Sequence, residues 1–152
     1  MNDKKTVFLV DDNRIQSQML QEWLRSNRGY SIFLAFDGEE ALKILRSGVA
    51  IDLMVLDVKM PKIDGLTLCR ILNEEYWYIV RIIMTGYAND VMIAKAKLEY
   101  GAVDVIRKPC APAVIGEIID KVLGLSKEIR KDDGILIPEA TEFYRSGDYA
   151  RI

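Results

Sequence analysis

Five side chains have types and positions that suit phosphoryl chemistry. They lie just after four short apolar runs and are Asp11, Asp12, Asp57, Thr85 and Lys108. Three carboxylates held close together repel one another unless a cation lies between them. An open, all-oxygen set with room for water favours Mg²⁺ over Ca²⁺. A metal ion, an ammonium and a hydroxyl around one point can stabilise a phosphoryl group, so the sequence predicts a site for phosphoryl transfer.

The nucleophile of such a site can be one of the carboxylates, which gives an aspartyl phosphate. Asp57 follows the most apolar of the runs, at 51–56. A run of this kind is typical of a strand buried in the middle of a parallel sheet. We therefore expect Asp57 at the centre of the sheet, with Lys108 beside it, and take Asp57 as the candidate phosphoacceptor.

The elements that must position these side chains alternate along the chain. Apolar runs predict strands at 6–10, 30–36, 51–56, 80–84 and 103–106, and helical spacing of apolar residues follows each run. This order predicts the α/β class, with a doubly wound five-stranded parallel sheet and helices on both faces. Ligands of such sheets bind beyond the carboxyl ends of the strands, where the five candidate side chains would meet.

Local signals mark the helix ends. Asp37, with Glu40 three residues later, and Asn89 are predicted N-caps, and Gly101 follows the predicted fourth helix, which reaches about Tyr100. The last predicted helix spans 112 to about 125. It contains Gly116, at a cost of about 1 kcal/mol relative to alanine.

Composition limits the function classes. The chain has 152 residues, with 21 Lys and Arg against 23 Asp and Glu, and no histidine. The balanced charge argues against direct nucleic-acid binding, and the absence of histidine excludes a histidine phosphorelay within the chain. No apolar run reaches the roughly 18 residues of a membrane span, so a cytoplasmic protein is expected. Residues 1–125 are predicted to form one domain, and 126–152 a C-terminal tail that is a helix extension or linker.

Four motifs together resemble one known family. The sequence has VDDN after the first predicted strand, LDVKMPKIDG after the third, MTG after the fourth and RKP after the fifth. In this order they resemble a response regulator receiver domain, over roughly 4–125. The resemblance implies the flavodoxin-like strand order 2-1-3-4-5. It also implies a phosphoacceptor switch of a two-component system, which catalyses only its own phosphorylation and dephosphorylation.

The resemblance implies roles for the acidic residues. Asp57 matches the phosphoacceptor, which receives phosphate from a sensor histidine kinase or phosphotransfer protein. Asp12 matches the direct Mg²⁺ ligand, and Asp11 matches the acid that holds metal-bound water. Lys59 matches the position whose backbone carbonyl ligates the metal; its side chain and Tyr87 occupy variable positions that flank the phosphate.

The resemblance also implies a route for the signal. Thr85 matches a hydroxyl residue that moves toward the phosphate, and Lys108 matches the phosphate's ammonium partner, with a cis bond to Pro109. The fourth and fifth strands and the helices that follow them form the expected output face. Val105 departs from the family, which usually has an aromatic residue there that turns inward. The output protein is not identified by the sequence, and a homodimer stays open.

Two alternatives remain at this level. Val105 favours a receiver-like interaction module that works without phosphorylation. A small Mg²⁺-dependent phosphatase with an aspartyl nucleophile is the second. Haloacid-dehalogenase-type enzymes have a DxD pattern after the first strand, whereas this chain has adjacent Asp11 and Asp12 and little chain for a substrate cap.

Overall fold

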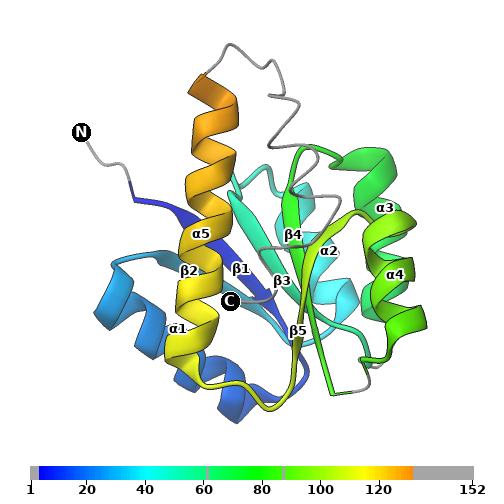
Figure 1. Ribbon diagram of the computed structural model, residues 1–152, viewed down its shortest axis with the longest axis horizontal. Helices are drawn as coiled ribbons and strands as arrows, with labels where there is room; N and C mark the ends of the chain where they lie inside the picture. The colour runs from blue at the N-terminus through cyan, green and yellow to red at the C-terminus, as the bar shows by residue number, and fades with distance from the viewer. Residues whose placement is uncertain (1–3, 61, 87, 132–152) are drawn as a thin grey trace.

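The five predicted strands form one parallel sheet. They are β1 (Thr6–Val10), β2 (Ser31–Ala35), β3 (Leu53–Asp57), β4 (Val80–Thr85) and β5 (Ala102–Arg107). A computed structural model describes residues 4–60, 62–86 and 88–131, with side chains described as far as residue 124. The strands lie side by side in the order β2-β1-β3-β4-β5, which confirms the predicted fold class and strand order (Figure 1).

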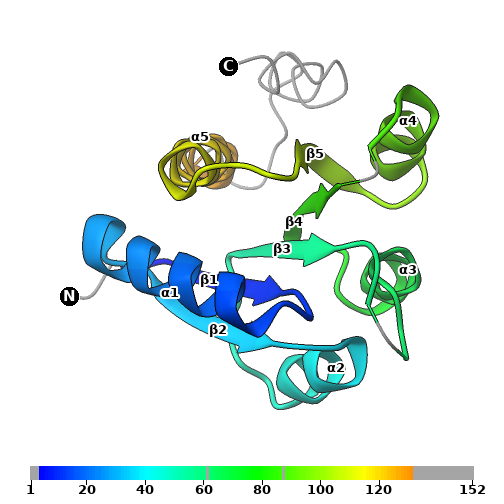
Figure 2. The ribbon, with the colours of Figure 1, turned by 90° about the horizontal axis from the view of Figure 1, so that it is seen from below.

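Five helices in the described part of the chain cover the two faces of the sheet. They are α1 (Arg14–Arg28), α2 (Gly38–Arg46), α3 (Gly65–Glu75), α4 (Asp90–Leu98) and α5 (Pro112–Lys131). Figure 2 shows α1 and α5 on one face and α2, α3 and α4 on the other. Each face has its own apolar core, one around Leu24 and Ile119 and one around Leu68 and Leu72. None of these described helices is both long and apolar enough to cross a membrane.

Side-chain caps fix where the helices begin. Backbone N–H groups donate to the side chains of Asn13, Asp37, Asp64 and Asn89, at 2.8 to 3.1 Å. The predicted caps at Asp37 and Asn89 are confirmed. The caps after β1, β2 and β4 lie only a few residues beyond the end of the strand. Capping therefore also fixes the short loops at the carboxyl edge of the sheet.

The strand ends differ from the predicted runs: β2 is one residue shorter at each end, β3 begins at Leu53 instead of residue 51, and β3 and β4 each extend one residue further at the carboxyl end. Asp57 and Thr85 are the last residues of β3 and β4, because Asp57 pairs with Met84 and Thr85 pairs with Arg107. The two polar side chains are therefore held by the sheet itself and not by loops. Backbone pairing continues to these residues although their side chains are polar, which hydrophobic periodicity cannot detect.

The helices after β4 and β5 also differ from expectation. α4 ends at Leu98, before the predicted Tyr100, whose side chain packs into the core at 4% exposure. α5 continues to Lys131, beyond the predicted end near residue 125. The first part of the predicted tail is thus a helix extension, and the remainder, 132–152, lies outside the described residues.

Candidate functional site

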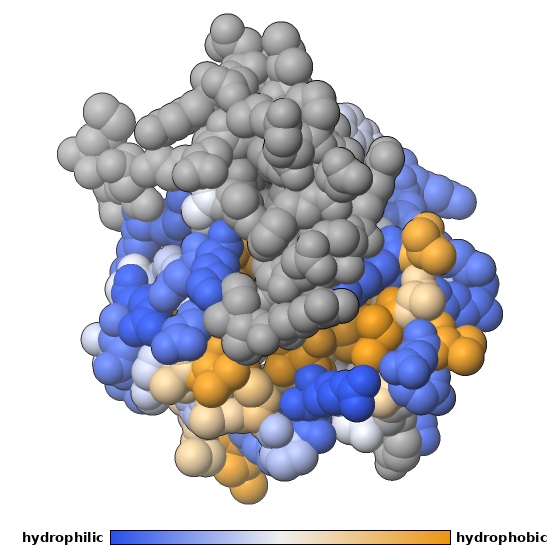
Figure 3. Space-filling view, viewed as in Figure 1, coloured by the Kyte–Doolittle hydropathy of each residue, from blue (hydrophilic) through white to orange (hydrophobic). Residues whose placement is uncertain are grey.

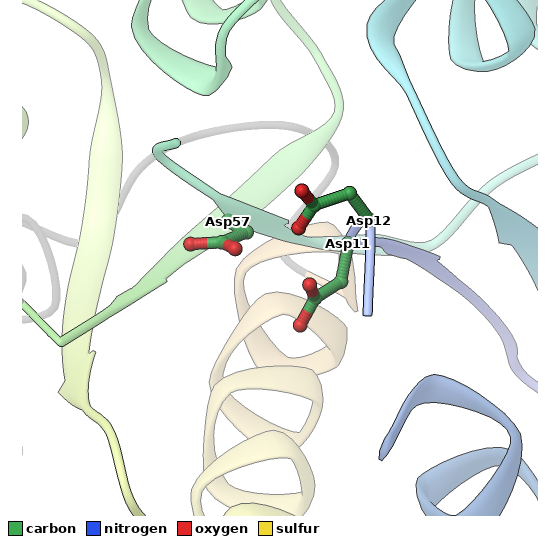
Figure 4. A group of neighbouring side chains, drawn as sticks. All are labelled: Asp11, Asp12 and Asp57. Atoms are coloured by element: carbon green, nitrogen blue, oxygen red, sulfur yellow. The ribbon is translucent and has the colours of Figure 1, made fainter. Parts of the chain in front are cut away.

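Three carboxylates converge at the carboxyl edge of the sheet. Asp11 and Asp12 follow β1, and Asp57 ends the neighbouring strand β3 (Figure 4). One carboxylate oxygen from each residue lies within 4.8 Å of the other two. Asp11 and Asp57 are buried, whereas Asp12 is exposed, so the cluster opens to solvent on one side.

Lys108 connects two of these acids. Its Nζ atom lies 2.8 Å from Oδ2 of Asp11 and 3.2 Å from Oδ2 of Asp57. Its backbone N–H donates to the carbonyl oxygen of Thr85 at 2.9 Å, and its bond to Pro109 is cis, as predicted. Thr85 is almost fully buried at the end of β4. The ammonium, the hydroxyl-bearing residue and the carboxylates therefore share one edge of the sheet, as the spacing of the sequence predicts.

Burial controls the charge of the central carboxylate. The pKa of Asp57 rises from 3.8 to about 6, mainly because burial disfavours the ionised form. The Lys108 ammonium opposes this rise, and the nearby Asp11 carboxylate adds to it. For Lys108, burial alone would lower the pKa, but the contacts with Asp11 and Asp57 outweigh burial and raise it. The single ammonium of Lys108 thus contacts two buried carboxylates, and it compensates the negative charge of Asp57 only in part.

The donor set fits a hard divalent cation. The clustered side chains offer carboxylate oxygens only, and the exposed side at Asp12 leaves room for water ligands, which Mg²⁺ retains in proteins. Lys59 lies with Asp12 on the wall of an open hollow of about 520 Å³. Tyr87, the other predicted flanking residue, lies outside the described residues.

Two features of the site escape sequence reasoning. The first residue of α3, Gly65, approaches β3 so closely that a Cβ atom would lie 2.1 Å from the carbonyl oxygen of Asp57. The second is a cavity of about 360 Å³ between α1 and α5, with Met19, Met84 and Ile115 among its apolar walls. Its lining residues come from segments far apart in the chain, so no local pattern predicts it. An Asp-Gly pair at 64–65 was the only local signal for the first feature.

Comparison with known proteins supports the same interpretation. The sequence model of the response regulator receiver domain matches residues 7–120. A probable transcriptional regulator, ycf27, of Cyanidium caldarium is 38% identical over 77% of this chain and 45% of its own length. The response regulator MprA of Mycolicibacterium vanbaalenii is 36% identical over 84% of this chain and 53% of its own length. The chain thus spans about half the length of these relatives.

Solved structures show the same fold. A response regulator receiver domain protein (CheY-like) from Methanospirillum hungatei gives a TM-score of 0.76 at 25% identity, over 83% of this chain and 98% of the other. The signal receiver domain of an HD domain-containing protein from Pseudomonas fluorescens gives 0.75 at 28% identity, over 82% and 98%. Because the family match covers most of the residues, with every strand residue except Thr6 and all three acidic residues of the site, this chain belongs to the response regulator receiver domain family.

Proposed function

We propose that this receiver domain accepts a phosphoryl group on Asp57 from the phosphohistidine of a sensor histidine kinase or phosphotransfer protein. The observation that carries the proposal is the position of Asp57. Its carboxylate ends the central strand, lies close to two further acids and contacts the Lys108 ammonium at 3.2 Å. A carboxylate oxygen would form the new O–P bond while the N–P bond of the phosphohistidine breaks and the imidazole nitrogen leaves with the electron pair.

The other residues would stabilise the charge that this transfer develops. Asp11, Asp12 and Asp57, with the backbone carbonyl of Lys59, would hold Mg²⁺, which supplies positive charge to the phosphoryl oxygens. Lys108 would give up its contact with one carboxylate and bind a phosphoryl oxygen. Because its Nζ atom already lies between Asp11 and Asp57, this requires only a small movement of the side chain.

Phosphorylation would change the charge at Asp57 from one negative charge to about two. The Thr85 hydroxyl and the Lys108 ammonium would move toward it. These two residues end adjacent strands and are joined by a backbone hydrogen bond of 2.9 Å, so we expect β4 and β5 to respond together. Val105 is half-buried against the core on the α4 side, and the signal would pass through β4 and α4 without an aromatic side chain.

Acetyl phosphate offers a direct test, because it can replace the protein donor. With Mg²⁺, intact-mass spectrometry should show one added phosphoryl group on the natural protein and none on Asp57→Asn. The matched control Asp90→Asn removes an exposed carboxylate from the first turn of α4 and should label like the natural protein. Equal labelling of Asp57→Asn would contradict the assignment of Asp57.

The interaction module without phosphorylation is the second candidate, because Val105 occupies the position where the family usually has an aromatic residue. It predicts that Asp57→Asn leaves binding of an output protein unchanged, whereas our proposal predicts a loss of the phosphate-dependent change. The phosphatase alternative predicts steady turnover of p-nitrophenyl phosphate. Our proposal predicts slow, single-turnover phosphorylation of the protein's own carboxylate instead of steady turnover.

A further inference from the structure

The surface formed by α4, β5 and the start of α5 combines exposed apolar side chains with basic ones. We refer to it as the α4–β5 face and define it by Val91, Ala94, Lys95, Lys97, Leu98, Val103, Val105, Arg107 and Val114. In Figure 3, hydrophobic residues gather over α4 beside hydrophilic ones. Such a combination is typical of a surface that contacts another polypeptide.

The apolar part of this face has a helical period. Val91, Ala94 and Leu98 follow one another at spacings of three and four residues, and all three are exposed. Val91 is 76% exposed and Leu98 is 83% exposed, the two largest values among the exposed large apolar residues of the described part. An amphipathic helix normally turns this stripe toward a core. α4 therefore presents outward an apolar stripe of the kind that helices use for packing.

The segment 132–152 of this chain has the composition that the face would bind. Its apolar residues cluster at Ile135–Ile137 and at Phe143–Tyr144. It has five acidic residues and two arginines, so its net charge is opposite to that of Lys95, Lys97 and Arg107 on the face.

The geometry of α5 allows the segment to reach this face. α5 and β5 run in opposite directions (Figure 1), and 20 helical residues extend about 30 Å whereas the six residues of β5 extend about 20 Å. The chain therefore leaves α5 about 10 Å beyond the start of β5. The residues after Lys131 can span up to about 70 Å when extended, which exceeds the distance back along the whole strand.

We propose that residues 132–152 dock on the α4–β5 face of the same molecule. The apolar residues of the segment cover the α4 stripe, and its acids lie near the basic side chains. The segment then occupies the surface through which a receiver of our proposed function would contact its output protein. This last consequence rests on the proposed function, but the docking itself does not require phosphate.

Hydrogen–deuterium exchange of the full chain, without phosphodonor, tests the docking. The amides of 135–144 should exchange about tenfold more slowly than in an unstructured peptide of the same sequence. Leu98→Glu should abolish this protection, because it introduces negative charge into the apolar stripe. Ile15→Glu is the matched control: Ile15 is 72% exposed on α1, and its substitution should leave the protection unchanged. Both positions are exposed, so neither variant should prevent folding.

Three results would overturn the proposal. The first is exchange of 135–144 at the unprotected rate in the natural protein. The second is equal protection in the natural protein and in Leu98→Glu. The third is protection that disappears on dilution, which would show that a second copy covers the face instead. Because no phosphate is present in this experiment, its failure leaves the phosphorylation of Asp57 unaffected.

Discussion

At the scale of single residues, the unusual feature is a carboxylate that is buried beside other acids. Asp57 shares one ammonium with Asp11, and burial raises its pKa to about 6. An ionised carboxylate in this environment is stabilised by any group that neutralises its charge and by a metal ion that it binds. The same environment that makes Asp57 costly in the metal-free protein therefore prepares it for Mg²⁺ and for a phosphoryl group.

A pH-dependent stability follows from this pKa. The folded-state value of about 6 exceeds the ordinary value of 3.8, so the folded protein holds the proton more tightly. The resulting stabilisation is complete below about pH 4 and is lost as the pH rises through about 6. In metal-free buffer, Asp57→Asn should thus be more stable than the natural protein by about 2–3 kcal/mol at pH 7.5, but not at pH 4.

Urea unfolding at several pH values measures this difference. Glu117→Gln, which alters an exposed carboxylate on α5, serves as the control and should show no comparable change with pH. Addition of Mg²⁺ at pH 7.5 should raise the free energy of unfolding of the natural protein more than that of Asp57→Asn. A stability difference that is the same at both pH values would refute the raised pKa.

At the scale of elements, the contact between α1 and α5 explains why α5 contains Gly116, although glycine has a low helix propensity. A Cβ atom at Gly116 would lie 2.7 Å from the ring of Trp23, so the glycine lets the two helices approach each other. The Trp23 ring is also held by the Arg28 guanidinium at 5.0 Å. Asp120 on α5 accepts a hydrogen bond from Arg28, at the end of α1, and one from Tyr30, in the segment between α1 and β2.

Alanine should therefore have opposite effects at two positions of α5. We expect Gly116→Ala to lower the free energy of unfolding by about 1–2 kcal/mol, because the added methyl group displaces the Trp23 ring. Gly124→Ala meets no atom within 4 Å and should raise it by up to about 1 kcal/mol through helix propensity. Urea unfolding of both variants measures the two effects. A stabilised Gly116→Ala protein would contradict the packing role.

For these elements, the sequence predicts features that depend on neighbouring residues and misses features that depend on contacts between distant residues. The caps at Asp37 and Asn89 depend on residues three positions away, so the sequence predicts them correctly. The convergence of Asp11, Asp57 and Lys108 was predictable because parallel strands share a carboxyl edge. The sequence does not predict the role of Gly116, because that role depends on its contact with Trp23 on another helix.

At the scale of the whole molecule, one sheet separates two apolar cores. The core around Leu24 lies under α1 and α5, and the core that contains Cys69 lies under α2, α3 and α4. Each strand contributes side chains to both cores, because successive residues point to opposite faces. If the strands separate on one side of the sheet, the apolar side chains of the other core therefore also become exposed to water.

We expect the two cores to unfold in one transition. In a Trp77→Phe/Cys110→Ser protein, Trp23 fluorescence reports on the α1–α5 side, and labelling of the Cys69 thiol reports on the opposite core. Cys69 is 0% exposed, so a thiol reagent reaches it only after that core opens. Both probes should give the same urea midpoint. Two separate midpoints would show that the cores unfold independently.

The position of the phosphoryl group is the most direct test of the central claim. After incubation with acetyl phosphate and Mg²⁺, borohydride reduction converts an aspartyl phosphate into homoserine, which tandem mass spectrometry can locate. We predict homoserine at residue 57 and none at residues 11 or 12, although all three carboxylates lie within 4.8 Å of one another. Homoserine at Asp11 or Asp12, or at none of the three, would contradict the account.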